Sequence, residues 1–161
     1  MKDMEWRPMR TDDLPAVAAI SAAVHGDFAE TLATYEERLA LYPAGCITLE
    51  EEGAPVGFLI SHPWHAGQFP ALNQQLGAIP HENVDYYLHD IALLPQTRGS
   101  GAGKAALAFV IAHARARGFE RVTLVAVNGA DRFWSAQGFE HADMREAGPY
   151  GPGTFVMHLA L

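Results

Sequence analysis

The stretch that decides the fold is P-Q-T-R-G-S-G-A-G-K-A-A-L, residues 95–107, in which three glycines alternate through five positions between an arginine and a lysine. It follows a strand-like run and opens a segment whose apolar residues recur at helical spacing. The first turn of a helix has backbone N–H groups without an intrahelical partner, and the helix dipole adds partial positive charge there. Glycines remove the Cβ atoms that would hold a ligand away from these groups. The stretch therefore predicts a cradle for an anion such as a pyrophosphate.

The charge pattern around this stretch agrees with an anion site. The protein has a net charge of −8, which argues against a general nucleic-acid binder because the phosphate backbone would be repelled. Residues 91–119 nevertheless contain no Asp or Glu and carry Arg98, Lys104, Arg115 and Arg117. An acidic protein with one basic island favours a small anionic ligand there; the alternative is basic residues clustered on a solvated helix face.

The bulk properties predict one domain spanning residues 1–161, long enough for a sizeable core. No apolar run approaches the roughly 20 residues that a membrane span needs, and the first residues lack the apolar core of a signal peptide. The single cysteine, Cys46, excludes an internal disulfide and fits a reducing compartment. We expect a cytoplasmic protein without membrane or nucleic-acid partners, in which Cys46 fills the core.

Periodicity and turn residues predict a mixed α+β domain built on one central sheet. Strands are expected near residues 4–10, 46–51, 55–62, 86–94, 121–127, 139–145 and 154–161. Helices are expected near residues 15–24, 30–41, 101–117 and 130–137. Gly118 stands where a left-handed helix C-terminus belongs, with Phe119 folding back onto Ala114. A long loop is expected over residues 63–84, and such loops are often functional.

Three nucleotide-binding motifs compete for the glycine segment. A P-loop fails because Arg98 stands where its first glycine belongs and Ala105 follows Lys104 in place of Ser or Thr. A dinucleotide fingerprint is matched on paper by residues 101–106, but no acid for the ribose ends the next strand, so NAD binding is a weak alternative. The third motif, [QR]xxGx[GA], is present as R-G-S-G-A-G at residues 98–103.

With its surroundings, this third match resembles the GNAT superfamily of N-acetyltransferases. The resemblance rests on I-A-L-L-P-Q-T-R-G-S-G-A-G-K, then V-A-V-N, then A-D-R-F-W-S-A-Q-G-F, and covers residues 86–139. It implies an α+β GNAT fold, in which a mixed, mostly antiparallel sheet of six to seven strands is splayed between strands 4 and 5 and flanked by about four helices. It also implies acetyl-CoA as co-substrate, no metal, and acetyl transfer to an amine by direct attack in a ternary complex.

The resemblance also assigns roles to particular residues. The pantetheine arm of acetyl-CoA would pair with the backbone of Ile91, Ala92 and Leu93, and Asn128 would lie near that arm. The amide of Leu93 would stabilise the oxyanion. The residues expected to hold the pyrophosphate are Arg98, Gly99, Ser100, Gly101, Ala102, Gly103 and Lys104.

One position departs from the family pattern. Many members place a Tyr in the short helix before G-F as the proton donor, and here Trp134 stands there. An indole N–H is not a practical acid, so we expect Trp134 to pack against the cofactor's arm or sulfur. Tyr87 and Tyr150 are the alternative proton donors, and transfer without a dedicated acid is the third option.

The candidate bases lie on the fourth strand. Regular alternation puts His89 on the same face as Leu93, and an imidazole that titrates near 6.5 suits a general base. Asp90 is the second candidate, because a bulge here would reverse the alternation. The alternative for His89 is a structural role.

The segments expected to form the acceptor pocket combine acids and aromatics, which suits a cationic amine with an apolar body. Trp64, Phe69 and Leu72 are expected to line this pocket or to form a satellite core, and the histidines near Pro63 match no strong metal signature. A small-molecule amine is the first expectation, a protein amine the second, and a catalytically silent acyl-CoA sensor the third; a homodimer is compatible with all three. The other residues expected around the acceptor are Asp27, Glu30, Tyr35, Glu36, Glu37, Glu82 and Asp85.

Overall fold

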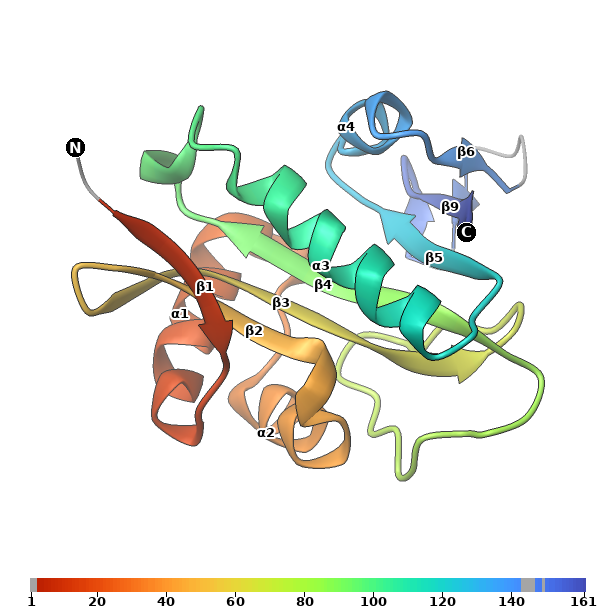
Figure 1. The fold of residues 1–161 in the computed structure, drawn as a ribbon, viewed down its shortest axis with the longest axis horizontal. Helices are drawn as coiled ribbons and strands as arrows, with labels where there is room; N and C mark the ends of the chain where they lie inside the picture. The colour runs from red at the N-terminus through yellow and green to blue at the C-terminus, as the bar shows by residue number, and fades with distance from the viewer. Residues whose placement is uncertain (1–2, 143–146, 149) are drawn as a thin grey trace.

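The structure is a computed structural model that describes residues 3–142, 147–148 and 150–161, and it is built on one seven-stranded sheet (Figure 1). The strand order is β1-β2-β3-β4-β5-β9-β6, and every neighbouring pair is antiparallel except β4 and β5. The strands are β1 (Met4–Pro8), β2 (Cys46–Glu51), β3 (Ala54–His65), β4 (Val84–Leu93), β5 (Arg121–Ala126), β6 (Glu140–His141) and β9 (Phe155–Ala160). A separate ladder joins β7 (Ala147–Gly148) and β8 (Gly151–Pro152). The expected mixed, mostly antiparallel sheet is confirmed.

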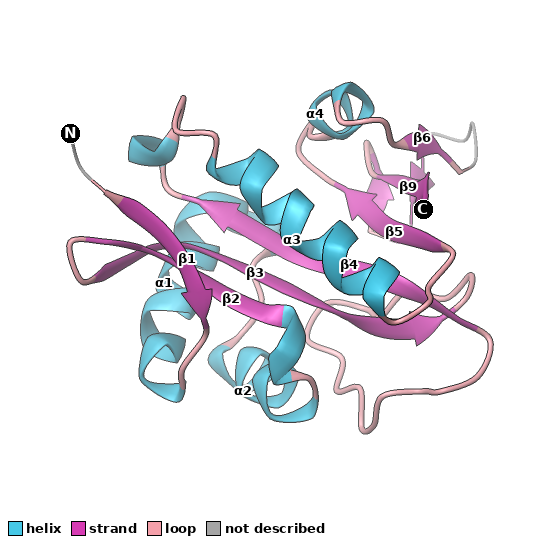
Figure 2. Ribbon diagram, viewed as in Figure 1, coloured by secondary structure: helices cyan, strands magenta, loops and turns pink. Residues whose placement is uncertain are grey.

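Helices cover both faces of the sheet (Figure 2). The α-helices are α1 (Leu14–His25), α2 (Leu32–Leu41), α3 (Ala102–Ala116) and α4 (Asp131–Ala136). Short 3-10 turns are η1 (Thr11–Asp13), η2 (Gly26–Phe28), η3 (Pro43–Gly45) and η4 (Pro95–Thr97). Helices α1 and α2 pack on one face and α3 crosses the other (Figure 1).

Two apolar clusters on opposite faces form most of the core. The cluster on the α3 side includes Leu59, Tyr86, Leu88, Leu107, Val110, Ala114, Val122 and Leu124. The cluster on the α1 and α2 side includes Val17, Ile20, Tyr35, Leu39, Phe58, Ile60 and Ala92. Strands β3 and β4 contribute to both clusters because their side chains point alternately to the two faces.

The sheet forks between β4 and β5. These two strands pair only at Tyr86 with Val122 and at Tyr87 with Thr123, near the start of each strand. From Leu88 onward β4 has no partner on this side within the described residues, so the two strands diverge. The splay expected between the fourth and fifth strands is therefore present.

A β-bulge interrupts β4. Asp90 pairs with Ile60 and Leu88 pairs with Ser61, which leaves His89 as an extra residue. The expectation that His89 shares a face with Leu93 is consequently wrong. His89 and Asp90 both bond to residues of the α1 and α2 side, whereas Leu88 packs on the α3 side.

Capping residues in the sequence predict most helix ends to within one or two residues. Gly118 has φ +79°, and the N–H of Phe119 donates to the carbonyl oxygen of Ala114 over 3.0 Å, which confirms the expected helix end. The second helix starts at Leu32 rather than Glu30, because the hydroxyl of Thr31 caps it by accepting from the N–H of Thr34.

The long loop is shorter than expected, because β3 continues through Pro63 to His65. Strand β2 pairs with β3 no further than Ile60, so Pro63 lies where β3 has an open edge and its missing N–H costs no ladder bond. Of the sixth expected strand only Glu140–His141 is formed, and its residues 143–145 lie outside the described residues.

Candidate active site

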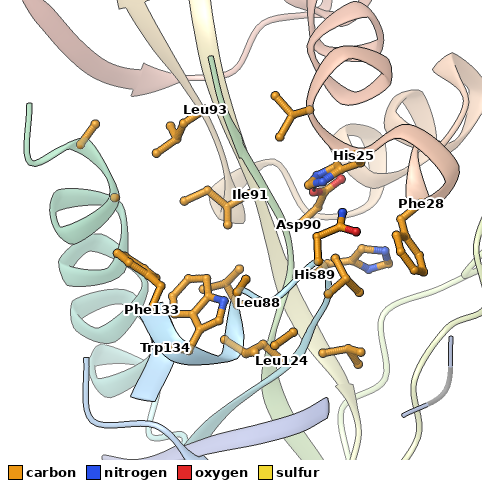
Figure 3. A pocket seen from close by; sticks show the side chains of 18 of the residues that line it. His25, Phe28, Leu88, His89, Asp90, Ile91, Leu93, Leu124, Phe133 and Trp134 are labelled. Carbon is orange, nitrogen blue, oxygen red and sulfur yellow. Dashed lines mark hydrogen bonds and ion pairs between the residues drawn. The ribbon is translucent and has the colours of Figure 1, made fainter. Parts of the chain in front are cut away.

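A cavity of about 540 Å³ occupies the fork between β4 and β5 (Figure 3). One side is formed by α1, η2 and the loop 66–83, and the other by the glycine segment and α4. The residues on the first side include Val24, His25, Phe28, Glu30 and Leu72. Those on the second include Arg98, Gly99, Gly101, Gly103, Lys104, Asn128, Phe133 and Trp134, with Leu88, His89, Asp90, Ile91 and Leu93 of β4 between the two sides.

The backbone of β4 presents two amides to the fork. The N–H of Leu94 donates to the carbonyl oxygen of Val56 on β3 over 2.9 Å. Because such bonds alternate along an antiparallel pair, the amides of Ile91 and Leu93 point away from β3 and toward the fork. The amide of Ala92 points the opposite way, toward β3. The side chain of Ala92 is 1% exposed and does not line the cavity, so it belongs to the core.

The glycine segment leaves four amides free. Three others are bonded within the chain: Arg98 N–H to the Pro95 carbonyl, Ser100 N–H to the Thr97 carbonyl, and Ala102 N–H to the Ser100 hydroxyl. Among the residues that the structure describes, the amides of Gly99, Gly101, Gly103 and Lys104 have no hydrogen-bond partner. From Arg98 to Gly103 bonded and free amides therefore alternate, and the free amide of Lys104 extends the set.

The local geometry favours glycine at three of these positions, for two different reasons. Gly99 and Gly101 have φ values of +76° and +80°, which a side chain would strain. Gly103 has an ordinary φ, but a Cβ there would stand 3.3 Å from the ring of Phe133. The first two glycines shape the turn, and the third lets α3 and α4 approach closely.

Two cations flank the free amides. Arg98 and Lys104 both line the cavity, and neither forms an ion pair within the described part of the chain. Free amides at the start of a 15-residue helix and two unpaired cations together suit a ligand with two negative charges.

Trp134 closes the cavity on the α4 side. Its ring is 5% exposed and packs edge-on against Phe133 and Phe139, at centroid distances of 5.0 and 5.4 Å. It lies across the cavity from His25 and Phe28 (Figure 3). Asn128 follows β5 with a left-handed φ of +54° and also lines the cavity.

The hydrogen bonds of His89 leave it no free nitrogen. Nδ1 of His62 donates to the carbonyl oxygen of Pro63 over 2.8 Å, and burial lowers the pKa of His62 to about 3, so its Nε2 is an acceptor. That atom lies 3.0 Å from Nδ1 of His89, which must donate. Nε2 of His89 lies 3.1 Å from Oε1 of Glu30. Both ring nitrogens of His89 are therefore bonded to protein partners, and neither is open to a substrate.

Asp90 is bonded at both carboxylate oxygens. Oδ2 accepts from the hydroxyl of Tyr35 over 2.6 Å, and Oδ1 lies 2.6 Å from Nε2 of His25. His25, the last residue of α1, was missed by the sequence analysis. It is separated from Asp90 by 65 residues, and no local pattern marks it.

Neither candidate tyrosine is an obvious acid. Tyr87 is fully buried, does not line the cavity, and burial raises its pKa well above the usual value. Tyr150 does line the cavity, but its hydroxyl donates to the carbonyl oxygen of Pro70 over 2.8 Å. Burial raises the pKa of Tyr150 to about 12.

Most residues expected around an acceptor lie elsewhere. Of the acids among them only Glu30 lines the cavity, and Leu72 is the one of the three loop residues that does. Glu37 instead accepts the amides of Leu76 and Gly77, which ties the loop to α2. Among the described residues, no group of three or more His, Cys, Asp or Glu is arranged to hold a metal ion. No helix in this part of the chain is both long and apolar enough to cross a bilayer.

Comparison with known proteins identifies the type of fold. Residues 6–139 match the model of the acetyltransferase (GNAT) family. No curated protein matches the sequence significantly.

Three solved structures illustrate the similarity. The loading GNATL domain of CurA from Lyngbya majuscula is 19% identical, with a TM-score of 0.79 over 97% of this chain and 96% of that one. The GphF GNAT-like decarboxylase in complex with isobutyryl-CoA is 21% identical, with a TM-score of 0.77 over 97% and 98%. The ribosomal-protein-S18-alanine N-acetyltransferase from Escherichia coli is 20% identical, with a TM-score of 0.70 over 98% and 94%.

Proposed function

Because the chain belongs to the GNAT acetyltransferase family, we propose that it transfers the acetyl group of acetyl-CoA to the primary amine of a small molecule. The amine attacks the thioester directly while both substrates are bound. The observation that carries this proposal is the set of four free amides, at Gly99, Gly101, Gly103 and Lys104, at one side of a cavity that continues along β4.

The cavity suits coenzyme A in two parts. The diphosphate would accept hydrogen bonds from the free amides and be neutralised by Arg98 and Lys104. The pantetheine arm would pair with the fork-facing backbone of Ile91, in the place that β5 leaves open. Phe133 and Trp134 would pack against the arm from the other side.

The chemistry then takes place beside Leu93. As the amine nitrogen bonds to the thioester carbon, the carbonyl oxygen becomes an oxyanion, and the fork-facing amide of Leu93 is placed to donate to it. The C–S bond breaks next and coenzyme A leaves as a thiolate. A thiol is a reasonable leaving group without a protonating acid, which agrees with Trp134 at the position of the family's tyrosine.

The acceptor side favours a small amine with an apolar body. Val24, Phe28 and Leu72 supply apolar surface, and the two carboxylates nearby, Glu30 and Asp90, are each already paired with a histidine. A polycation would need unpaired acids, so a monoamine fits better than a polyamine.

The loop 66–83 covers this side and argues against a protein acceptor. Its backbone is tied down from three directions: Asn73 N–H donates to Glu30, Arg38 donates to the carbonyl oxygen of Gln74, and Tyr150 donates to that of Pro70. A long peptide would have to displace these bonds. Acetylation of a protein amine is the second candidate, since one structural relative is named as an N-acetyltransferase of an alanine of ribosomal protein S18.

A screen for thiol release tests the proposal. Purified protein is mixed with acetyl-CoA and a panel of aryl and alkyl monoamines, polyamines, amino acids and N-terminal peptides, and products are identified by mass. We expect turnover on an apolar monoamine. Preference for peptides would move the function to protein acetylation, and saturable acetyl-CoA binding without turnover on any amine would identify a silent sensor.

A further inference from the structure

His25 is the more accessible partner of a buried histidine–aspartate pair. Its side chain is 13% exposed and lines the cavity, whereas that of Asp90 is 8% exposed. The pair joins the end of α1 to the bulged part of β4, between the apolar acceptor side and Ile91 (Figure 3). A titratable side chain therefore faces the cavity near the place where an amine would meet a thioester.

The carboxylate of Asp90 fixes the tautomer of this histidine. Oδ1 of Asp90 can only accept, so Nε2 of His25 carries the hydrogen of the 2.6 Å bond. Neutral His25 then has its lone pair on Nδ1, which has no hydrogen-bond partner among the described residues. A histidine with one nitrogen on a carboxylate and the other free is arranged to accept a proton.

The orientation of Asp90 is itself fixed by α2. Oδ2 accepts from the hydroxyl of Tyr35 over 2.6 Å, and this hydroxyl lies 2.8 Å from that of Ser21. The Tyr35 hydroxyl has a single proton to donate, and the carboxylate of Asp90 is a stronger acceptor than the hydroxyl of Ser21. The Ser21 hydroxyl therefore donates to the hydroxyl oxygen of Tyr35. Tyr35 is 1% exposed and Ser21 is fully buried, which makes the support rigid.

We propose that His25, positioned by Asp90, is the base that takes the proton from the acceptor amine. The inference rests on the proposed function. As the N–C bond forms and the C–S bond breaks, the proton on nitrogen passes to Nδ1 of His25 and coenzyme A leaves as a thiolate. The resulting imidazolium is stabilised by the adjacent carboxylate, and the proton is then lost to solvent.

The surroundings set the direction of the pH dependence. The ionisable groups that line the same cavity as His25 are Asp90 and His89 on β4, Glu30 before α2, Arg98 and Lys104 of the glycine segment, and Tyr150 before β8. Tyr35 on α2 acts through its bond to Asp90. Burial, the largest effect, lowers the pKa of His25, but the hydrogen bond and charge of Asp90 together with the charge of Glu30 outweigh it, so the pKa is raised above the usual 6.5. Since the base must be neutral, the rate should increase as the pH rises through this raised pKa.

His89, the other histidine in the cavity wall, is the matched contrast. Its side chain is 2% exposed and both nitrogens are bonded, to His62 and to Glu30. The same residue type on the same side of the sheet therefore has no lone pair available. This contrast allows the two histidines to be separated experimentally.

The test compares His25→Gln and Asp90→Asn with the control His158→Gln, which changes a half-buried histidine of β9 that does not line the cavity. Steady-state rates are measured against pH with the best amine of the panel, and acetyl-CoA affinity is measured by calorimetry. We expect kcat to fall about 10²–10⁴-fold in His25→Gln with acetyl-CoA affinity unchanged, the range for loss of a general base. Added imidazole should partly restore the rate of His25→Ala.

Asp90→Asn supplies a second readout that does not need turnover. Without the carboxylate, burial dominates and the pKa of His25 falls, which an NMR titration of the imidazole detects directly. The rising limb of the rate profile should move to lower pH by the same amount.

Two results would overturn the inference, and they are distinguishable. Wild-type turnover that survives in His25→Gln within about threefold at every pH removes His25 from the role, and an unchanged His25 titration in Asp90→Asn removes Asp90 as its positioning partner; both results leave the proposed function intact. Absence of wild-type turnover on any amine removes the proposed function and this inference with it.

Discussion

The backbone N–H of Leu94 donates to the carbonyl oxygen of Val56 over 2.9 Å, so the neighbouring amide of Leu93 points into the fork of the sheet. Along β4 the backbone amides point alternately toward β3 and toward the fork. An amide that does not bond to β3 is therefore a free donor in the fork. The proposed oxyanion donor is thus a consequence of strand geometry and needs no special side chain.

Leu93→Pro removes this donor while leaving the bond between β3 and β4 intact. We expect kcat to fall about 10²–10³-fold, the usual effect of losing one oxyanion donor, with folding retained. Steady-state kinetics and thermal unfolding measure the two effects. Leu94→Pro is the matched control, because it breaks the ladder bond and should lower the melting temperature instead. Equal kcat in wild type and Leu93→Pro would exclude the amide from catalysis.

Gly101→Ala should weaken acetyl-CoA binding. Its φ of +80° costs about 1–2 kcal/mol for a residue with a Cβ, so the turn relaxes and the free amides move apart. Gly118→Ala at the other end of α3 carries the same strain at φ +79° and is the matched control. Calorimetry should show about tenfold weaker binding in Gly101→Ala alone. Equal losses in both variants would show that only the stability of α3 matters.

Trp134→Phe should leave kcat within about threefold of wild type, because an indole N–H cannot serve as a general acid. The smaller ring should cost about 1 kcal/mol or more of unfolding free energy through lost packing against Phe139. Kinetics and urea denaturation test the two effects separately. A loss of kcat above about a hundredfold would mean that Trp134 acts in the chemical step.

Asp13 should control stability in acid. It bonds Arg7 over 2.7 and 2.9 Å, and this pairing lowers the pKa of Asp13 from 3.8 to about 2 despite burial. The stabilisation is complete above the unfolded pKa and is lost as the pH falls from about 4 through 2. Asp13→Asn should cost about 2 kcal/mol at pH 7, and the deficit should shrink toward pH 2. A deficit that stays constant with pH in urea titrations would contradict this account.

Local chemistry was enough to predict the anion-binding half of the site. The glycines near Ser100 and the helix that follows depend on φ preferences and unpaired first-turn amides, which are properties of neighbouring residues. The end of α3 at Gly118 was predictable for the same reason. The division into bonded and free amides was not, because it depends on the side chain of Ser100 and on the 3-10 turn before it.

The acceptor half could not be predicted because it is assembled from distant segments. His25 meets Asp90 only through the packing of α1 on the sheet, and no spacing rule connects residues 65 apart. The bulge at His89 was foreseen only as an alternative, since a bulge needs two strands and leaves no signal in one. Acids such as Glu37 and Asp85, expected near the acceptor, instead tie down a loop or pair with Arg121.

An NMR titration of the labelled protein with coenzyme A tests the central claim most directly. If the diphosphate binds the free amides, saturable shifts should be largest at Gly99, Gly101, Gly103 and Lys104, and smaller at the internally bonded amides of Ser100 and Ala102. The fork-facing amides of Ile91 and Leu93 should shift in the same titration. Saturation without shifts at these six residues, or no saturable shift anywhere, would contradict the account.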